Sequence, residues 1–161
     1  MSKYNPVYNV IWSSNRFSNL KFKSKLVFLY LLTNEKVSQT GIYNIALRHI
    51  ECDTGLSRED VANCISELEQ SGLINYWHND NLIFIKDNFK FARNMIKNSI
   101  ILSKTIEGQR NLYINDELWE MFDKKYYAEL EIINQALIKQ QSNKNSSIHN
   151  NHNKTYKEGI S

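Results

Sequence analysis

The longest apolar run of the chain is seven residues, Leu26 to Leu32. A run of this length fits either a buried strand or a buried helix. Because leucine is a good helix former and Ser24 can cap a helix at this point, we predict a helix. The residues before it are rich in aromatic side chains, and the expected core anchors among them are Trp12, Phe17 and Phe22.

A short strand at 41–43 and a second, short helix are predicted next. Apolar residues recur on one face of this helix, and Gly55 can adopt the left-handed conformation that ends it. Leu56 follows, and we expect it to fill the core between two helices. The residues assigned to the apolar face are Ile45, Leu47, Ile50 and Cys52.

Ser57 begins the clearest helix signal in the chain. A serine at the cap position, followed by Glu59 and Asp60, suits the positive end of a helix dipole. Gly72 is expected to end this third helix. Its buried stripe recurs at helical spacing and consists of Val61, Cys64, Ile65 and Leu68.

Two runs rich in β-formers, 73–77 and 82–85, flank the turn residues 78–81, which include His78. They predict a β-hairpin directly after the third helix. The order is then helix, strand, helix, tight turn, helix, hairpin, which is that of a winged helix-turn-helix. We therefore predict a mainly α fold with a small β-hairpin, with the winged helix-turn-helix domain over residues 1–92.

The second half of the chain predicts a C-terminal helical extension over 93–139. Residues 89–112 are basic and in part helical, and Asn115 can cap a further helix at 116–138. This helix packs on the winged domain, or it forms a homodimer or binds a partner. From Gln140 to Ser161 the composition predicts a disordered polar tail. The apolar stripe of the 116–138 helix is Leu118, Trp119, Phe122, Tyr126, Leu130, Ile133 and Leu137.

Charge changes this picture in one respect. The net charge is only +3, but positive and negative segments alternate along the chain. Such alternation fits a molecule with distinct basic and acidic faces, or ordinary surface charge that happens to cluster. Only the fold decides which segments share a face.

Several segments resemble the N-terminal domain of phage replisome organisers, replication-initiation proteins distantly similar to the DnaD primosome family. The resemblance covers the stretch from Trp12 to Lys86, about half the chain. It implies a winged helix that binds origin DNA or assembles with replication proteins, in the cytoplasm of a bacterial host. The segments that carry it are Lys25–Asn34, Gly41–Tyr43, Leu47–Arg48, Thr54–Ser57 and Leu68–Ile74.

In the usual docking of this fold, the third helix enters the major groove of duplex DNA. With the apolar stripe inward, Arg58 could read guanine and Asn63 adenine, since each makes paired hydrogen bonds there. Ser57 and the helix N-terminus could hold a phosphate. Ser66 completes the candidate set, and the other residues expected to face outward are Glu59, Ala62 and Glu67.

Acidic residues count against base reading by this helix. Residues 58–70 hold one arginine and four acids, so the helix carries a net charge of −3. Acids that face or flank phosphates weaken affinity. Three roles therefore remain open for the third helix: it reads bases, it is merely structural, or it faces a protein.

Basic residues elsewhere are better candidates for phosphate contacts. One group follows the hairpin, interleaved with Phe89 and Phe91, and consists of Lys86, Lys90, Arg93 and Lys97. A second group precedes the first helix and fits phosphate contacts or plain solvated lysines equally well. It consists of Lys21, Lys23 and Lys25.

The sequence gives little support for an enzymatic function. The sequence has no phosphate-cradling glycine loop, no H-E-x-x-H and no G-x-S-x-G. We expect no catalytic residues, no cofactor and no metal site. The two cysteines lack metal-ligand spacing, and a signal-peptide core is not found at the N-terminus, so we expect a soluble cytoplasmic protein.

Three hypotheses follow. The first is a DNA-binding protein of phage type that acts in replication initiation, with double-stranded DNA and replication proteins as partners. The second is a transcription regulator with the same fold. The third is a protein-interaction module or inhibitor that uses the acidic third helix.

Overall fold

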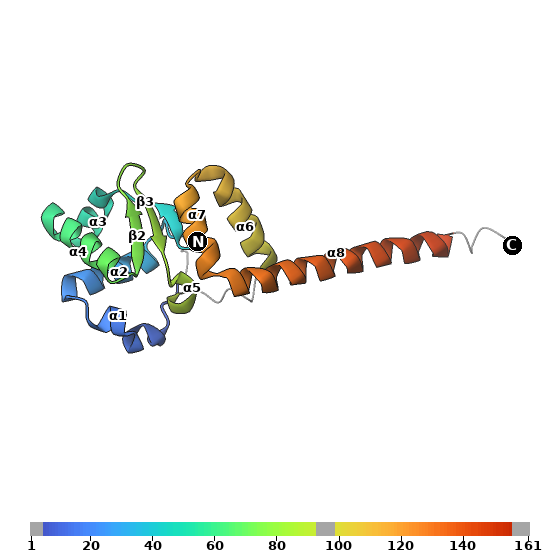
Figure 1. The fold of residues 1–161 in the computed structure, drawn as a ribbon, viewed down its shortest axis with the longest axis horizontal. Helices are drawn as coiled ribbons and strands as arrows, with labels where there is room; N and C mark the ends of the chain where they lie inside the picture. The colour runs from blue at the N-terminus through green and yellow to red at the C-terminus, as the bar shows by residue number, and fades with distance from the viewer. Residues whose placement is uncertain (1–4, 93–98, 156–161) are drawn as a thin grey trace.

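The computed structural model describes residues 5–92 and 99–155. It shows a small three-stranded sheet with helices on both faces (Figure 1). The order of elements confirms the predicted winged helix-turn-helix. Its elements are the 3-10 turn η1 (Asn9–Ser13), α1 (Asn15–Ser18), α2 (Phe22–Thr33), β1 (Ile42–Asn44), α3 (Leu47–Thr54), α4 (Arg58–Gln70), β2 (Ile74–Trp77) and β3 (Leu82–Ile85).

The first long helix, α2, begins earlier than predicted. Its N-cap is Lys21, whose backbone N–H donates to Glu67 Oε1 at 3.1 Å. Ser24 is buried inside the helix and donates to Glu67 Oε2 at 2.6 Å. The prediction that Ser24 caps this helix is therefore wrong, because a carboxylate of α4 takes that role at the positive end of α2.

The turn between α3 and α4 matches the prediction closely. Gly55 has a φ of +71°, the left-handed conformation in which a side chain would be strained. Ser57 Oγ accepts the backbone N–H of Asp60 at 3.1 Å and caps α4. Cys64 is buried in the predicted stripe, whereas Cys52 is exposed, so its assignment to the apolar face is wrong.

The sheet is antiparallel with the strand order β1-β3-β2, so β3 lies in the centre. Ile74 pairs with Ile85 at the base of the β2–β3 hairpin, and Trp77 pairs with Leu82 at its tip. The turn that joins them, residues 78–81, is the wing turn. Its last residue, Asn81, has a φ of +48°, which asparagine tolerates better than most side chains.

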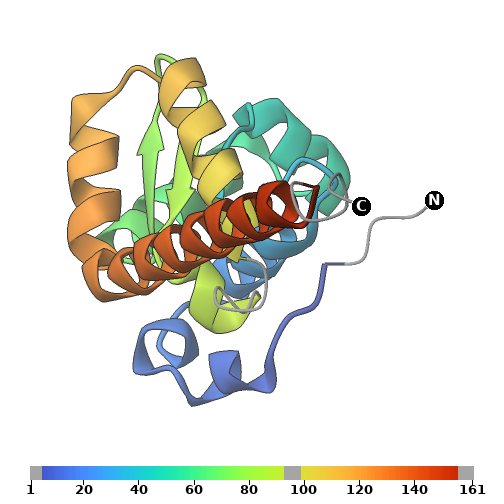
Figure 2. The ribbon, with the colours of Figure 1, turned by 90° about the vertical axis from the view of Figure 1, so that its right-hand side faces the viewer.

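The two faces of the sheet bury different groups of side chains, because neighbours along a strand point to opposite faces. Ile83 and Ile85 of β3 face the core formed with α2, α3 and α4. Leu82 and Phe84 face the other core, which the C-terminal helices cover. The helix-turn-helix and the C-terminal helices thus lie on opposite faces (Figure 2).

In the described residues after the hairpin, four further helices follow: α5 (Asn88–Phe91), α6 (Ser99–Leu112), α7 (Asp116–Lys125) and α8 (Tyr127–Thr155). Asn115 Oδ1 accepts the N–H of Leu118 at 2.9 Å, which confirms the predicted cap. The single helix predicted over 116–138 is instead divided at Tyr126. This residue leaves helical geometry, its ring is buried, and its hydroxyl donates to the carbonyl of Lys86.

The apolar stripe of the 116–138 segment packs within the chain, against the face of the sheet that carries Leu82 and Phe84. Leu118, Phe122 and Ile133 are buried there with Phe84. Packing on the winged domain is therefore the alternative that the structure supports. The residues that suggested a homodimer through this segment are occupied by intrachain contacts.

Beyond residue 139 the structure continues α8 to Thr155, where the composition predicts a disordered tail. Extension of a helix already anchored at its N-terminal half adds one hydrogen bond for each residue fixed. Residues 141–143 are exposed. None of the helices within residues 5–92 and 99–155 combines the length and apolarity needed to traverse a bilayer.

Only one of the three predicted aromatic anchors is buried. Phe17 is fully buried and its ring centroid lies 5.9 Å from that of Phe28. Trp12 and Phe22 are 63% and 76% exposed, so their prediction as core anchors is wrong. The ring of Trp12 lies nearly perpendicular to that of Phe17, with the ring centroids 5.2 Å apart, and Phe22 lies on the outward side of α2.

Candidate nucleic-acid interface

Three of the four acids of α4 are bound to neighbouring elements. The ammonium of Lys23 on α2 lies 2.7 Å from Asp60 Oδ1. Glu67 accepts the two hydrogen bonds from the start of α2 described above. Glu69 Oε1 accepts the backbone N–H of Tyr76 on β2 at 2.9 Å. The acids of α4 therefore serve mainly to hold the helix against α2 and the hairpin.

These contacts also lower the pKa values of two of the carboxyl groups. The hydrogen bond from the Lys23 ammonium holds the pKa of Asp60 below its ordinary value. The hydrogen bond from the Ser24 hydroxyl does the same for the pKa of Glu67. Both effects stabilise the ionised form.

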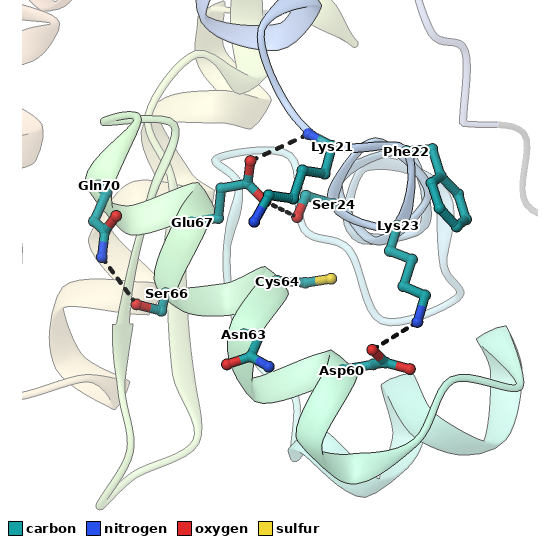
Figure 3. A pocket seen from close by; sticks show the side chains of 10 residues that line it. All are labelled: Lys21, Phe22, Lys23, Ser24, Asp60, Asn63, Cys64, Ser66, Glu67 and Gln70. Atoms are coloured by element: carbon teal, nitrogen blue, oxygen red, sulfur yellow. Dashed lines mark hydrogen bonds and ion pairs between the residues drawn. The ribbon is translucent and has the colours of Figure 1, made fainter.

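The side of α4 that faces solvent is nearly neutral. At 100° per residue, the side opposite the buried stripe carries one charged side chain and four small or amide side chains. Glu67 was predicted to face outward, which is wrong, because it turns onto α2 (Figure 3). We call this set the outward row, and it consists of Glu59, Ala62, Asn63, Ser66 and Gln70.

Cationic side chains meet at the N-terminal end of α4. Arg58 and Arg48, from the starts of α4 and α3, line one groove together with His78 and Asn81 of the wing turn. Glu51 of α3 also lines it, so the two arginines leave an excess of positive charge there. The cap residue Ser57 is exposed beside Arg58. We call this the wing-side groove. Arg48 carries no sequence signal for this role, because only the folded hairpin brings the wing turn to it.

A second groove lies between α2 and α4 (Figure 3). Asn63 and Ser66 line it from α4, and Lys21 and Lys23 line it from α2. Lys23 is paired with Asp60, and the ammonium of Lys25 lies 5.9 Å from the ring centre of Phe17. Lys23 and Lys25, which were predicted to precede the first helix, thus lie inside α2 and have partners within the chain.

Lys86 lies at the base of the hairpin, in a cluster around the buried carboxylate of Asp87. Lys125 Nζ lies 2.5 Å from Asp87 Oδ1, and Arg16 binds Oδ2. Partial burial lowers the pKa of Lys86, and repulsion from Lys125 and Arg16 adds to this effect. We call Arg16, Lys86 and Lys125 the basal cluster. The sequence offers no signal for Arg16 or Lys125, because both join it through tertiary contacts.

The basal cluster and the wing-side groove lie at opposite ends of α4. The N–H of Lys86 donates at 3.0 Å to the carbonyl of Leu73, just after α4 ends, whereas Arg58 begins the helix. Thirteen residues of helix span about 20 Å. Cations therefore flank the outward row at both of its ends.

Of the other three residues predicted to contact phosphates after the hairpin, the structure describes only Lys90. Lys90 is exposed on α5, with its ammonium 5.7 Å from the ring centre of Phe91. Arg93 and Lys97 lie outside the described residues. The interleaved aromatics are not free to stack on bases, because Phe91 is buried and Phe89 packs 4.8 Å from the ring centre of Tyr126.

The fold and this surface define a winged helix-turn-helix protein with a C-terminal helical extension. No protein-family model matches the chain, and no curated protein or solved structure is significantly similar to it. Within the described part of the chain, no group of three or more histidine, cysteine or acidic side chains is placed to hold a metal ion.

Proposed function

We propose that this protein binds duplex DNA by placing α4 in the major groove. The observation that carries the proposal is the arrangement of charge on α4. Asp60, Glu67 and Glu69 turn onto neighbouring elements, which leaves a nearly neutral polar row toward solvent. Cations stand at both ends of that row. A net charge of −3 for the helix therefore does not describe the surface that DNA would meet.

Base reading is assigned to the exposed polar residues of α4. Arg58 can make paired hydrogen bonds to guanine, and Asn63 can make them to adenine. Ser66 lies one turn beyond Asn63 on the same face, with its hydroxyl already accepting from Gln70 at 3.2 Å. Ser57 and the free N–H groups at the start of α4 form a site for a phosphate.

Phosphate contacts are assigned to the two flanking groups. Arg48 and His78 of the wing-side groove serve one end of α4, and Lys86 and Lys90 serve the other. Such contacts set the register of the protein on the duplex, whereas α4 supplies the sequence preference.

We infer replication initiation as the process, and this step rests on the resemblance to phage replisome organisers. A transcription regulator would use the same surface, and the position of the preferred DNA site, at an origin or at a promoter, separates the two. The structure favours neither of them over the other. It weakens the third hypothesis, because most of the acids that would attract a basic protein are already engaged.

The test is a fluorescence anisotropy titration of labelled duplex DNA over a series of salt concentrations. Each phosphate contact contributes about −0.9 to the slope of log affinity against log salt. We expect a slope of several units, and a shallower slope for the Lys86→Glu, Lys90→Glu double variant. The Arg58→Ala, Asn63→Ala double variant should reduce the difference in affinity between the preferred duplex and a duplex of random sequence.

The matched control is Lys104→Ala, because Lys104 is exposed on α6, whose apolar side packs on the other face of the sheet. This variant should bind as the unaltered protein does. Lack of binding even at low salt would overturn the proposal. If Lys104→Ala lost as much DNA affinity as the variants on the α4 side, α4 would not be the DNA-binding surface.

A further inference from the structure

From Leu26 to Leu32 the helix α2 carries apolar side chains on all sides, although the described part of the chain fully covers only one side. Val27, Phe28 and Leu31 are buried in the core. On the opposite side, Phe22 is 76% and Leu26 is 44% exposed. A helix that is hydrophobic all round is normally buried on all sides. With the half-buried Leu29 and Tyr30, these residues form what we call the α2 ridge.

Charges at the two ends of the α2 ridge are the reverse of what the helix dipole favours. Lys21, Lys23 and Lys25 lie in or beside the first turn, where acids are favourable. Because Asp60 neutralises Lys23, the excess positive charge at this end comes from Lys21 and Lys25. At the other end, Tyr30 donates to Asp53 at 2.5 Å, and the charges of Asp53 and Glu35 add to burial in raising the pKa of Tyr30. The ridge therefore runs from a basic end to an acidic end.

We propose that a second copy of this chain covers the α2 ridge, with the two α2 helices antiparallel about a twofold axis near Leu26. In this arrangement Phe22 of each copy packs on Tyr30 of the other. Lys21 and Lys25 at one end then face Asp53 and Glu35 of the second copy at the other. A twofold interface requires such a self-complementary surface.

The charge pattern selects a second copy over other occupants. A different partner would need its own matching gradient of charge, whereas antiparallel pairing supplies it without further assumption. Another exposed apolar site, Leu112 and Ile114 beside the wing turn, lacks this property. It is flanked by the acids Asp80, Asp116 and Glu117, all of one sign.

Sedimentation velocity of the full chain without DNA tests the proposal, so its outcome does not depend on DNA binding. Twice the chain mass of 19.0 kDa is expected for the unaltered protein. Phe22→Asp with Leu26→Asp should raise the dissociation constant at least about thirtyfold, as expected for central interface aromatics. Circular dichroism establishes that the variant is folded.

The matched control is Ile114→Asp, because Ile114 is 92% exposed away from the α2 ridge. It should remain dimeric. A monomeric unaltered protein over the accessible concentration range would overturn the proposal. So would a dimer that survives the Phe22 and Leu26 substitutions.

A charge exchange tests the antiparallel orientation. Lys21→Glu places like charges against Asp53 and Glu35 of the second copy and should weaken the dimer about tenfold at low salt. Adding Asp53→Lys should restore most of the lost affinity. A double variant as weak as the single one would overturn the antiparallel arrangement.

Discussion

Glu67 of α4 accepts a hydrogen bond from Ser24 of α2, with Oε2 at 2.6 Å from Oγ. Its other carboxylate oxygen accepts the backbone N–H of Lys21 at 3.1 Å. One side chain thus caps the first helix of the helix-turn-helix and removes a negative charge from the surface assigned to DNA. The stability of the domain and the character of its outward row depend on the same residue.

Glu67→Ala should lower the free energy of unfolding by about 1–2 kcal/mol, because α2 loses its cap and the buried Ser24 hydroxyl loses its acceptor. Chemical denaturation measures this change. Glu120→Ala is the control, since Glu120 is exposed on α7 and its loss should stay within about 0.5 kcal/mol. Equal effects of the two substitutions would contradict a capping role for Glu67.

The bond from Ser24 also predicts a dependence on pH. It lowers the pKa of Glu67 from its ordinary value of 4.5 in the folded state, so its stabilisation is complete above that value and disappears as the pH falls below it. The difference in stability between the unaltered protein and Ser24→Ala should therefore shrink on acidification below about pH 4.5. Urea denaturation from pH 3 to pH 7 measures it. A difference that is constant with pH would assign the effect of Ser24→Ala to packing alone.

Lys86→Met should stabilise the fold while weakening DNA binding. Burial and repulsion from Lys125 lower the pKa of Lys86, so its charge disfavours the folded state at neutral pH. Replacement by an apolar side chain of similar length removes this effect and should raise Tm. The gain should shrink at alkaline pH, because the folded lysine then loses its proton first.

The same variant should reduce the salt slope of DNA binding by about 0.9, the value for one phosphate contact. Lys104→Met, on the far face of the sheet, is the control for both readouts. A fall in Tm with an unchanged slope would make Lys86 structural and remove it from the phosphate-binding set.

Asp87→Asn should cost about 2–3 kcal/mol of unfolding free energy, because it leaves Arg16 and Lys125 without their buried anionic partner. This figure is below the range of about 3–5 kcal/mol for fully buried pairs, since both cations are partly exposed. Asp123→Asn is the control. Asp123 is paired with Arg110 on the surface, where such a pair contributes about 0–1 kcal/mol. Comparable losses from both substitutions in thermal denaturation would contradict the distinction between the two ion pairs.

Much of the fold could be predicted from the sequence, because its decisive signals are local. The caps at Ser57 and Asn115 bind N–H groups three residues ahead. Gly55 ends α3 through its own backbone conformation. The stripe of Val61, Cys64, Ile65 and Leu68 recurs at the helical period and is buried. Such features depend on near neighbours, so the order of residues alone determines them.

The incorrect predictions concern contacts between residues distant in the chain. Ser24 looked like a cap, but Glu67, 43 residues away, competes for that role. Phe22 looked like a core anchor, but packing of α2 on α4 turned it to solvent. The predicted helix over 116–138 is interrupted at Tyr126, whose hydroxyl binds the carbonyl of Lys86 across 40 residues.

The candidate surface shows the same division. The sequence by itself determined that Asn63 and Ser66 would share the exposed side of α4, because the helical period places them there, and that Arg58 would follow the cap at the start of this helix. Only the tertiary structure decided that three of the four acids of that helix turn onto neighbouring elements and that Arg48 lies beside the wing turn. Periodicity distinguishes a buried side from an exposed one, whereas the partner of each charge depends on which elements the fold packs together.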